Sequence, residues 1–175
     1  MTSTARAITN LVLAQAVWFA CVLGGNAGSV SLVLHLGIYQ GCIGSLGRDW
    51  RILLPIAAIG YAVDSTLAAL GFLHYPGPTL APLLPAPLWL AALWLSFATL
   101  FLHGLQWLQG RLWLAAGLGA VAGAGTYYVG AGLSGATLGI TTQAFLLVHA
   151  LLWAIMTPLF TCLARTTPDA HPVAA

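Results

Sequence analysis

The residues with the most chemistry to offer are the few ionisable side chains inside long apolar stretches. Asp64 lies in such a stretch, and Tyr61 and Ser65 share its face of a predicted helix through spacings of three and four residues. An aspartate at the centre of a membrane costs about 2.5–3.5 kcal/mol, so each such residue is a functional candidate. Paired with a histidine, whose imidazole titrates near neutrality, Asp64 would form an acid–base couple.

Two histidines are candidate partners for Asp64. With a helical rise of 1.5 Å per residue, Asp64 lies ~18 Å from the start of its stretch, and His35 and His149 lie ~9 Å and ~12 Å from the outer ends of theirs. Tyr127 and Tyr128 fall at a similar level, so these side chains are expected in one outer-leaflet cavity. The predicted catalytic set is Asp64, His35, His149, Tyr61 and Tyr127. An aspartate that only fixes helix packing is the alternative.

A second polar group lies toward the other end of the predicted helices. Gln and His side chains between membrane helices usually act as interhelical hydrogen-bond glue, and that is the favoured interpretation here. A path that carries substrate across the bundle is the alternative, and its candidate lining residues are His103, Gln106, Gln15 and Tyr128.

The similar depth of His35 and His149 also raises haem b, because two neutral imidazoles on facing helices are suitable axial ligands. Nothing in the sequence shows that those helices face each other, and neither a metal-binding spacing nor another cofactor motif is present. No bound cofactor or metal is therefore expected.

Composition decides where these side chains must be positioned. The chain has 175 residues, of which 60% are hydrophobic and only 5% charged, and its mean hydropathy is +0.94. Soluble domains carry about 25% charged residues. A soluble enzyme, a nucleic-acid binder and a disordered chain are therefore excluded, and an integral membrane protein is predicted.

A membrane helix needs roughly 20 apolar residues. Six stretches qualify, namely residues 8–24, 29–46, 52–73, 88–109, 112–130 and 141–163. With six spans, all five arginines fall on one side, which is typical of the cytoplasm. We expect an all-α polytopic bundle with both termini cytoplasmic, formed by residues 1–165 as one domain, with a flexible cytoplasmic tail at 166–175.

Three further patterns bear on the site. Ala115, Gly119 and Gly123 repeat every fourth residue, a spacing that lets membrane helices approach closely. The proline-rich loop 74–87 is interpreted as a tight connection, with a lid over a lateral opening as the alternative. The deep tryptophans are interpreted as packing groups rather than as a substrate cage; they are Trp18, Trp94 and Trp153.

The sequence contains several short motifs, namely Asn10-x4-Gln15-x2-Trp18-Phe19, Arg48-Asp49-Trp50, Pro87-Leu88-Trp89 and the Gly-rich Tyr127-Tyr128 segment. Together they resemble a family of small bacterial inner-membrane proteins, the domain of unknown function number 2878. The resemblance covers about residues 8–163 and implies an inner-membrane protein. Members are often encoded near genes for fatty-acid cyclopropanation and flavin oxidoreductases, which implies a role in lipid modification. The family lends no catalytic residue.

These observations are compatible with three functions. The favoured one is an enzyme of the bacterial inner membrane, or its essential subunit, that modifies a lipid or acyl chain through Asp64 and a histidine. The others are a small proton-coupled transporter and a structural or accessory protein without catalysis. The expected partners are the lipid bilayer, a lipid or acyl substrate, and a second copy or another membrane protein; nucleic acid is excluded.

Overall fold

The computed structural model describes residues 2–43, 46–81 and 84–165, and its main elements are helices. The expected tail at 166–175 lies outside these residues. The helices are α1 (Ser3–Gly28), α2 (Ser31–Ile43), α3 (Leu46–Ala69), α4 (Leu88–Leu102), the short 3-10 helix η1 (Gln106–Leu108), α5 (Leu112–Leu118), the π-helical turn η2 (Gly119–Gly123), α6 (Ala124–Ser134) and α7 (Thr142–Arg165). Because α5, η2 and α6 follow without a break, they form one helical run.

Each of the six predicted stretches contains a helix. Four of the helices are long and apolar enough to cross a membrane: α1, α3, the run Leu112–Ser134, and α7. Helices α2 and α4 are shorter, with 13 and 15 residues. Helix α4 is shorter than the predicted stretch 88–109, because the regular helix ends before His103. Further on, Gly110 has a φ of 85°, a conformation suited to glycine.

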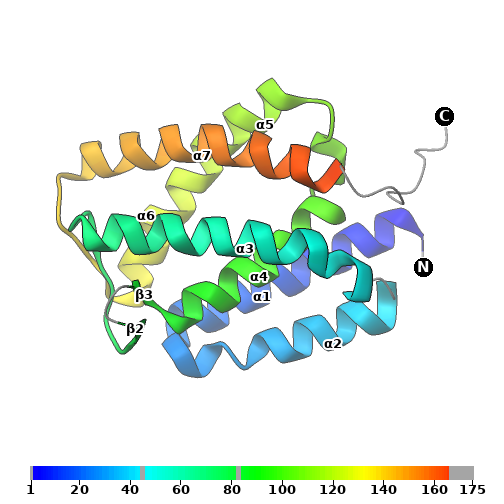
Figure 1. The fold of residues 1–175 in the computed structure, drawn as a ribbon, viewed down its shortest axis with the longest axis horizontal. Helices are drawn as coiled ribbons and strands as arrows, with labels where there is room; N and C mark the ends of the chain where they lie inside the picture. Colours follow the sequence, from blue (N-terminus) through cyan, green and yellow to red (C-terminus); the bar gives the residue numbers. More distant parts are fainter. Residues whose placement is uncertain (1, 44–45, 82–83, 166–175) are drawn as a thin grey trace.

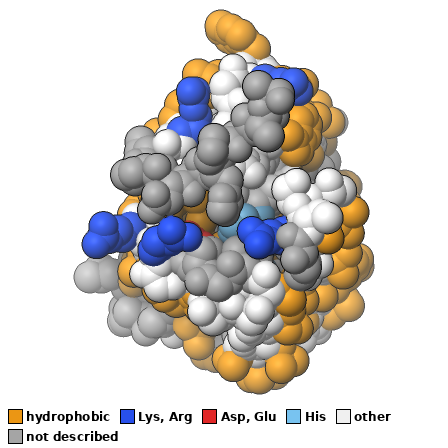
Figure 2. Space-filling view, turned by 90° about the vertical axis from the view of Figure 1, so that its right-hand side faces the viewer, with side chains coloured by type: hydrophobic (Ala, Val, Ile, Leu, Met, Phe, Trp, Pro, Cys, Tyr) orange, Lys and Arg blue, Asp and Glu red, His pale blue; other side chains and the backbone are white. Residues whose placement is uncertain are grey.

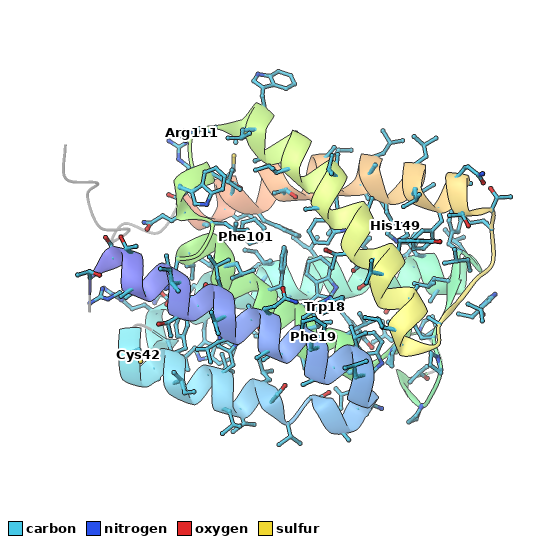
Figure 3. All side chains as sticks on the ribbon, turned by 180° about the vertical axis from the view of Figure 1, so that it is seen from behind. Trp18, Phe19, Cys42, Phe101, Arg111 and His149 are labelled. Atoms are coloured by element: carbon cyan, nitrogen blue, oxygen red, sulfur yellow. The ribbon has the colours of Figure 1, made fainter. Side chains whose placement is uncertain are left out.

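Helices α1, α2, α3, α4 and α7 lie roughly along one direction, and the run α5–α6 crosses them obliquely (Figures 1 and 3). The first turn of α1 and the last turn of α7 lie at the same end of the molecule, on the right in Figure 1. We call this the arginine end, because Arg6, Arg48, Arg51 and Arg165 occupy helix turns there and Arg111 precedes α5. Figure 2 shows basic side chains gathered over this end.

Apolar side chains cover the outside of the bundle as well as its interior. Large aliphatic residues on α1, α2 and α7 are mostly solvent-exposed, among them Val12, Val33 and Ile155, at 62%, 70% and 68%. Inside, α3, α4 and α7 share a core around Leu53, Phe101 and Phe160. An outer surface of this kind suits contact with lipid, and it supports the prediction of a membrane protein.

The end opposite the arginines contains four short strands, which were not expected from the sequence. They are β1 (Leu73–His74), β2 (Thr79–Ala81), β3 (Leu84–Pro87) and β4 (Thr137–Leu138). Glycines with positive φ, Gly71 and Gly135, end α3 and α6. The chain then turns back so that β1 pairs with β4, and β2 pairs with β3 in a small hairpin. The proline-rich loop is thus tied to the loop after α6.

Candidate functional site

Asp64 on α3 accepts hydrogen bonds from two aromatic side chains. The Trp94 Nε1–H of α4 donates to Oδ2 at 2.6 Å, and the Tyr127 hydroxyl of α6 lies 2.8 and 2.9 Å from Oδ1 and Oδ2. Asp64 is only 1% exposed. We call these three residues the Asp64 cluster, in which a buried carboxyl bridges three helices through hydrogen bonds to an indole and a phenol.

Two glycines make room for the indole rings around this cluster. A Cβ at Gly60, one turn before Asp64, would overlap the Trp94 ring, and a Cβ at Gly123 would overlap the Trp153 ring. The Trp94 and Trp153 rings stack with centroids 5.5 Å apart and an angle of 11° between their planes. The predicted small-residue spacing is therefore confirmed at Gly123 as a close approach between helices, and it seats an aromatic ring.

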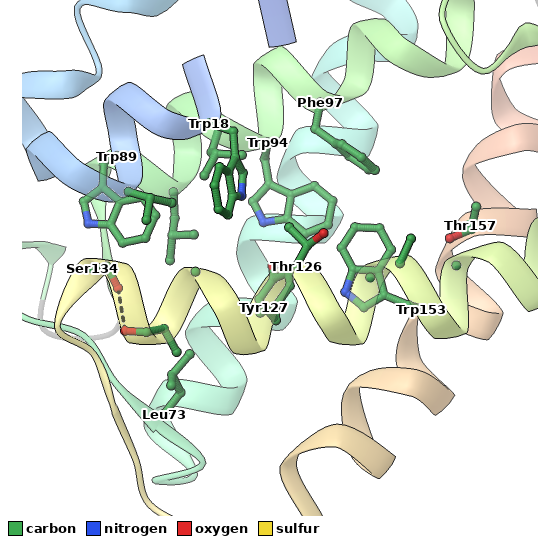
Figure 4. A pocket seen from close by; sticks show the side chains of 18 of the residues that line it. Trp18, Leu73, Trp89, Trp94, Phe97, Thr126, Tyr127, Ser134, Trp153 and Thr157 are labelled. Atoms are coloured by element: carbon green, nitrogen blue, oxygen red, sulfur yellow. Dashed lines mark hydrogen bonds between the residues drawn. The ribbon is translucent and has the colours of Figure 1, made fainter. Parts of the chain in front are cut away.

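A cavity of about 340 Å³ lies directly beside the Asp64 cluster (Figure 4). Its wall is mostly aromatic and aliphatic, and its aromatic members include Trp18, Trp89, Trp94, Phe97, Tyr127 and Trp153. We call it the aromatic cavity. Trp18, Trp94 and Trp153 were expected to be packing groups, and Trp94 and Trp153 do pack in the core. All three also line this cavity, so Trp94 and Trp153 both pack in the core and form part of the cavity wall.

The cavity is elongated along the run α5–α6. Leu118 lies near one end and Ser134 near the other, sixteen residues apart, which corresponds to about 24 Å of helix. At the end away from the arginines, Leu73 and Tyr75 of the proline-rich loop complete the wall. Burial raises the pKa of the Tyr75 phenol well above its ordinary value, so it stays neutral. The loop therefore does more than connect α3 to α4.

One polar atom near the arginine end of the cavity lacks a partner. Thr157 lines the cavity, and its Oγ1 is buried without a hydrogen bond among the residues that the structure describes. A buried hydroxyl without a partner is unusual in a folded protein. A Cβ at Gly119 would overlap this oxygen, so Gly119 makes room for the Thr157 hydroxyl between α7 and η2.

The two histidines lie in different surroundings, and neither hydrogen-bonds to Asp64 in the described part of the chain. The His149 Nδ1 is 2.9 Å from the Phe145 carbonyl oxygen, and the His149 ring lies 4.9 Å from the Tyr127 ring. The His35 Nδ1 is 2.8 Å from the Ser96 Oγ on α4. His149 thus borders the Asp64 cluster through Tyr127, whereas His35 packs against another helix. This arrangement gives no support to a haem held between the two imidazoles.

The other predicted residues on α1, α3, α6 and η1 lie away from the Asp64 carboxyl group. The Tyr61 hydroxyl donates to the Ala86 carbonyl oxygen at 2.6 Å, so it anchors the proline-rich loop instead of meeting Asp64. Tyr128 is 46% exposed, and Gln15 is also exposed, so both point away from the aromatic cavity. Gln106 lies in η1 and is half-buried. Of the predicted set, Asp64 and Tyr127 are in direct contact, and His149 lies next to them.

His103 belongs to a second cluster, at the arginine end. The Tyr39 hydroxyl of α2 donates to the Asp49 Oδ2 at 2.6 Å and is also hydrogen-bonded to the His103 Nε2. The His103 Nε2 lies 3.8 Å from the same Asp49 oxygen. We call these residues the Asp49 cluster. They tie α2 and α3 to the end of α4, and none of them lines the aromatic cavity.

Several of these contacts were missed from the sequence. Tyr39 was not singled out, and Asp49 was named only within the motif Arg48-Asp49-Trp50, although a carboxylate in the first turn of a helix is stabilised by the helix dipole. Asn10, which is fully buried, donates to the Thr99 Oγ1 at 2.7 Å and joins α1 to α4. Trp94 could have been found only from its pairing with Asp64, a contact between residues thirty positions apart.

Comparison with known proteins identifies a family for this fold but not an activity. No curated protein and no solved structure matches the chain. One family model matches residues 7–159, which include both clusters and all but the last turns of α7. The chain belongs to the family described as Protein of unknown function (DUF2878).

Proposed function

We propose that this protein is a membrane-embedded enzyme, or the essential subunit of one, that modifies a fatty-acid or lipid chain held in the aromatic cavity. One observation carries the proposal: Tyr127 lines the cavity while its hydroxyl is hydrogen-bonded to the buried Asp64. A long apolar cavity suits a hydrocarbon chain. A carboxyl that reaches its wall through a phenol supplies an acid–base group.

The roles follow from the contacts. Asp64 takes up or releases a proton, and Tyr127 relays it to the cavity, because a phenol both donates and accepts hydrogen bonds. Trp94 donates to Asp64 and fixes the orientation of its carboxyl group. His149 packs against the ring of Tyr127 and holds it in place.

The same proposal places the protein in the inner membrane of a bacterium, as one domain with six crossings and cytoplasmic termini. Its support is the gathering of the arginines at the end where α1 begins and α7 ends. Periplasmic reporter fusions test this orientation. Fusions within the proline-rich loop should be active in the periplasm, and fusions after Arg165 should be inactive there. The reverse pattern would contradict it.

A proton-coupled carrier is the second candidate. A carboxyl buried within an apolar helix, beside a cavity that takes a solute, is also what proton coupling requires. In that case Asp64 would change its protonation as the solute binds and leaves, and no lipid would change its covalent structure.

A whole-membrane lipid profile by mass spectrometry separates the candidates. We would compare cells lacking the gene with cells restored by the wild type, by Asp64→Asn, or by the matched variant Asp49→Asn. Protein level in the membrane is measured alongside. We expect one lipid species to disappear on deletion and to return with the wild type and Asp49→Asn, but not with Asp64→Asn.

An unchanged lipid profile in all strains would refute the enzymatic proposal and favour transport. Loss of the Asp64→Asn protein from the membrane would point instead to a packing role for Asp64. Tyr127→Phe then serves as the second variant, since it removes only the hydroxyl that links the carboxyl to the cavity.

A further inference from the structure

Positive charge is what the wall of the aromatic cavity is best equipped to hold. The faces of aromatic rings attract cations, and indole attracts them most strongly. Four tryptophans and two tyrosines line the cavity, and among the described lining residues there is no Lys, Arg or His. The wall is therefore rich in groups that stabilise a cation and contains none that would repel it.

The counter-charge lies just behind this wall. Asp64 hydrogen-bonds to Trp94 and Tyr127, which both line the cavity, and the structure gives it no cationic partner among the described residues. Its partners donate hydrogen bonds but carry no charge. Because a charge is screened weakly in a low-dielectric interior, an ionised Asp64 attracts a cation placed in the cavity.

The Asp64 cluster meets the cavity near the middle of its length. On the run α5–α6, Tyr127 lies seven residues from Ser134 and nine from Leu118, or about 10 and 14 Å. The stacked indoles of Trp94 and Trp153 lie at the same level, with Tyr127 and Trp153 rings 5.8 Å apart. A chain lying along the cavity therefore presents its midpoint to these groups.

Resting on the proposed function, we propose that the aromatic cavity binds a hydrocarbon chain that bears positive charge near its midpoint. The aromatic side chains that line the cavity stabilise the charge, and Asp64 is its counter-ion. The charge has two chemical sources: an ammonium group that the ligand already carries, or a carbocation formed within the chain.

The carbocation route balances without a further reagent. In this route Asp64 is protonated and donates to the Tyr127 oxygen, the reverse of the hydrogen bond that an ionised Asp64 accepts. Asp64 gives this proton to the Tyr127 oxygen as Tyr127 gives its own to a carbon–carbon double bond. The π electrons form the new C–H bond, and the adjacent carbon becomes cationic. Loss of a proton from a neighbouring carbon, back through Tyr127 to the carboxylate, re-forms a double bond and restores the acid. The product is an isomer of the starting chain.

Two probes of the same shape test the proposal. Dioctyldimethylammonium carries a positive charge at the middle of a chain, and dioctyldimethylsilane replaces the charged nitrogen with neutral silicon. Binding to the full-length protein in zwitterionic nanodiscs is followed by tryptophan fluorescence, with empty nanodiscs as the reference for partitioning. We expect the cation to bind about tenfold more tightly than the silane.

The variants locate the preference. Asp64→Asn should reduce it to about threefold or less, and Asp49→Asn should leave it unchanged, because the Asp49 cluster does not line the cavity. Trp153→Leu provides a second variant, which should reduce the preference for the cation over the silane by a factor of about three or more. Equal affinity for the two probes, or binding of neither, would overturn the inference. The lipid profile would then still stand as an independent test of the proposed function.

A deuterium experiment distinguishes the two sources of charge. The membrane is supplied with a mid-chain unsaturated fatty acid in heavy water, with Asp64→Asn as the control. Deuterium that enters the carbons next to the double bond only in the wild type identifies a cation formed by protonation. A cation preference without deuterium uptake identifies a ligand that carries its own charge.

Discussion

The Asp64 and Asp49 clusters contain the same chemical pair, a carboxyl that accepts a hydrogen bond from a tyrosine hydroxyl. Their surroundings differ. Asp49 lies in the first turn of α3, where a negative charge favours the helix N-terminus, and Tyr39 joins it to His103 beside the arginines. Asp64 lies deep in the same helix among aromatic rings, and its tyrosine lines a cavity.

Residue type alone therefore does not identify the site. The Asp49 cluster can be explained by what it holds together, namely α2, α3 and the end of α4. The Asp64 cluster is held by Trp94 and also borders a space that a ligand can enter, because Tyr127 lines the aromatic cavity. A buried carboxyl beside a cavity is the better candidate for chemistry.

The largest expected effect separates the two carboxyls by activity. Asp64→Asn should lower the rate at which the dependent lipid appears by about 10²–10⁴-fold, because it removes the acid–base group while keeping its shape. Asp49→Asn should lower that rate by about twofold or less. The measurement is pulse labelling of lipids at matched protein level. Equal losses in the two variants would end the distinction.

The next effect concerns Gly60 and Gly123, the two glycines that make room for indole rings beside the Asp64 cluster. Gly123→Ala should lower the free energy of unfolding by about 1–3 kcal/mol, because the added Cβ overlaps the Trp153 ring. Gly125→Ala, two residues further on, meets no atom within 4 Å and should be neutral or stabilise the helix slightly. Thermal unfolding followed by near-UV circular dichroism compares them. Similar melting temperatures of both variants would contradict the claim that Gly123 makes room for the Trp153 ring.

A smaller effect on stability is expected at the other cluster. Asp49→Asn should cost about 1 kcal/mol, because it removes the negative charge from the first turn of α3 and weakens the bond from Tyr39. Unfolding of the detergent-purified protein measures this. An unchanged stability would mean that the cluster has no structural role, and it would reopen the question of function there.

The smallest effect is expected at Thr157. Thr157→Val should change the free energy of unfolding by about 0.5 kcal/mol or less in the empty protein, since its buried Oγ1 has no partner among the described residues. A large loss of stability without ligand would show that Thr157 has a structural partner.

The order and approximate limits of the helices could be predicted, because a helix that spans a membrane needs about 20 apolar residues and such stretches are visible in the sequence. Asp64 and Tyr127 could be singled out for a similar reason, since polar groups inside such stretches are costly. Their partners could not be predicted. Whether Asp64 meets His149 or Trp94 depends on helix rotation and crossing, which the low amphipathicity of these helices leaves unmarked. Gly123 could be predicted as a point of close helix approach, but its contact with the Trp153 ring, and that of Gly60 with the Trp94 ring, depend on the tertiary structure.

Photolabelling shows whether the aromatic cavity holds a hydrocarbon chain. A fatty acid with a diazirine at mid-chain is incorporated into membranes and photolysed, and the labelled peptides are mapped in the wild type and in Ala122→Trp, which fills the cavity from its wall. We predict labels around Tyr127 and Trp153 that Ala122→Trp removes. Labels confined to the outer faces of the helices, for example near Val12 and Ile155, and unchanged by Ala122→Trp, would contradict the account.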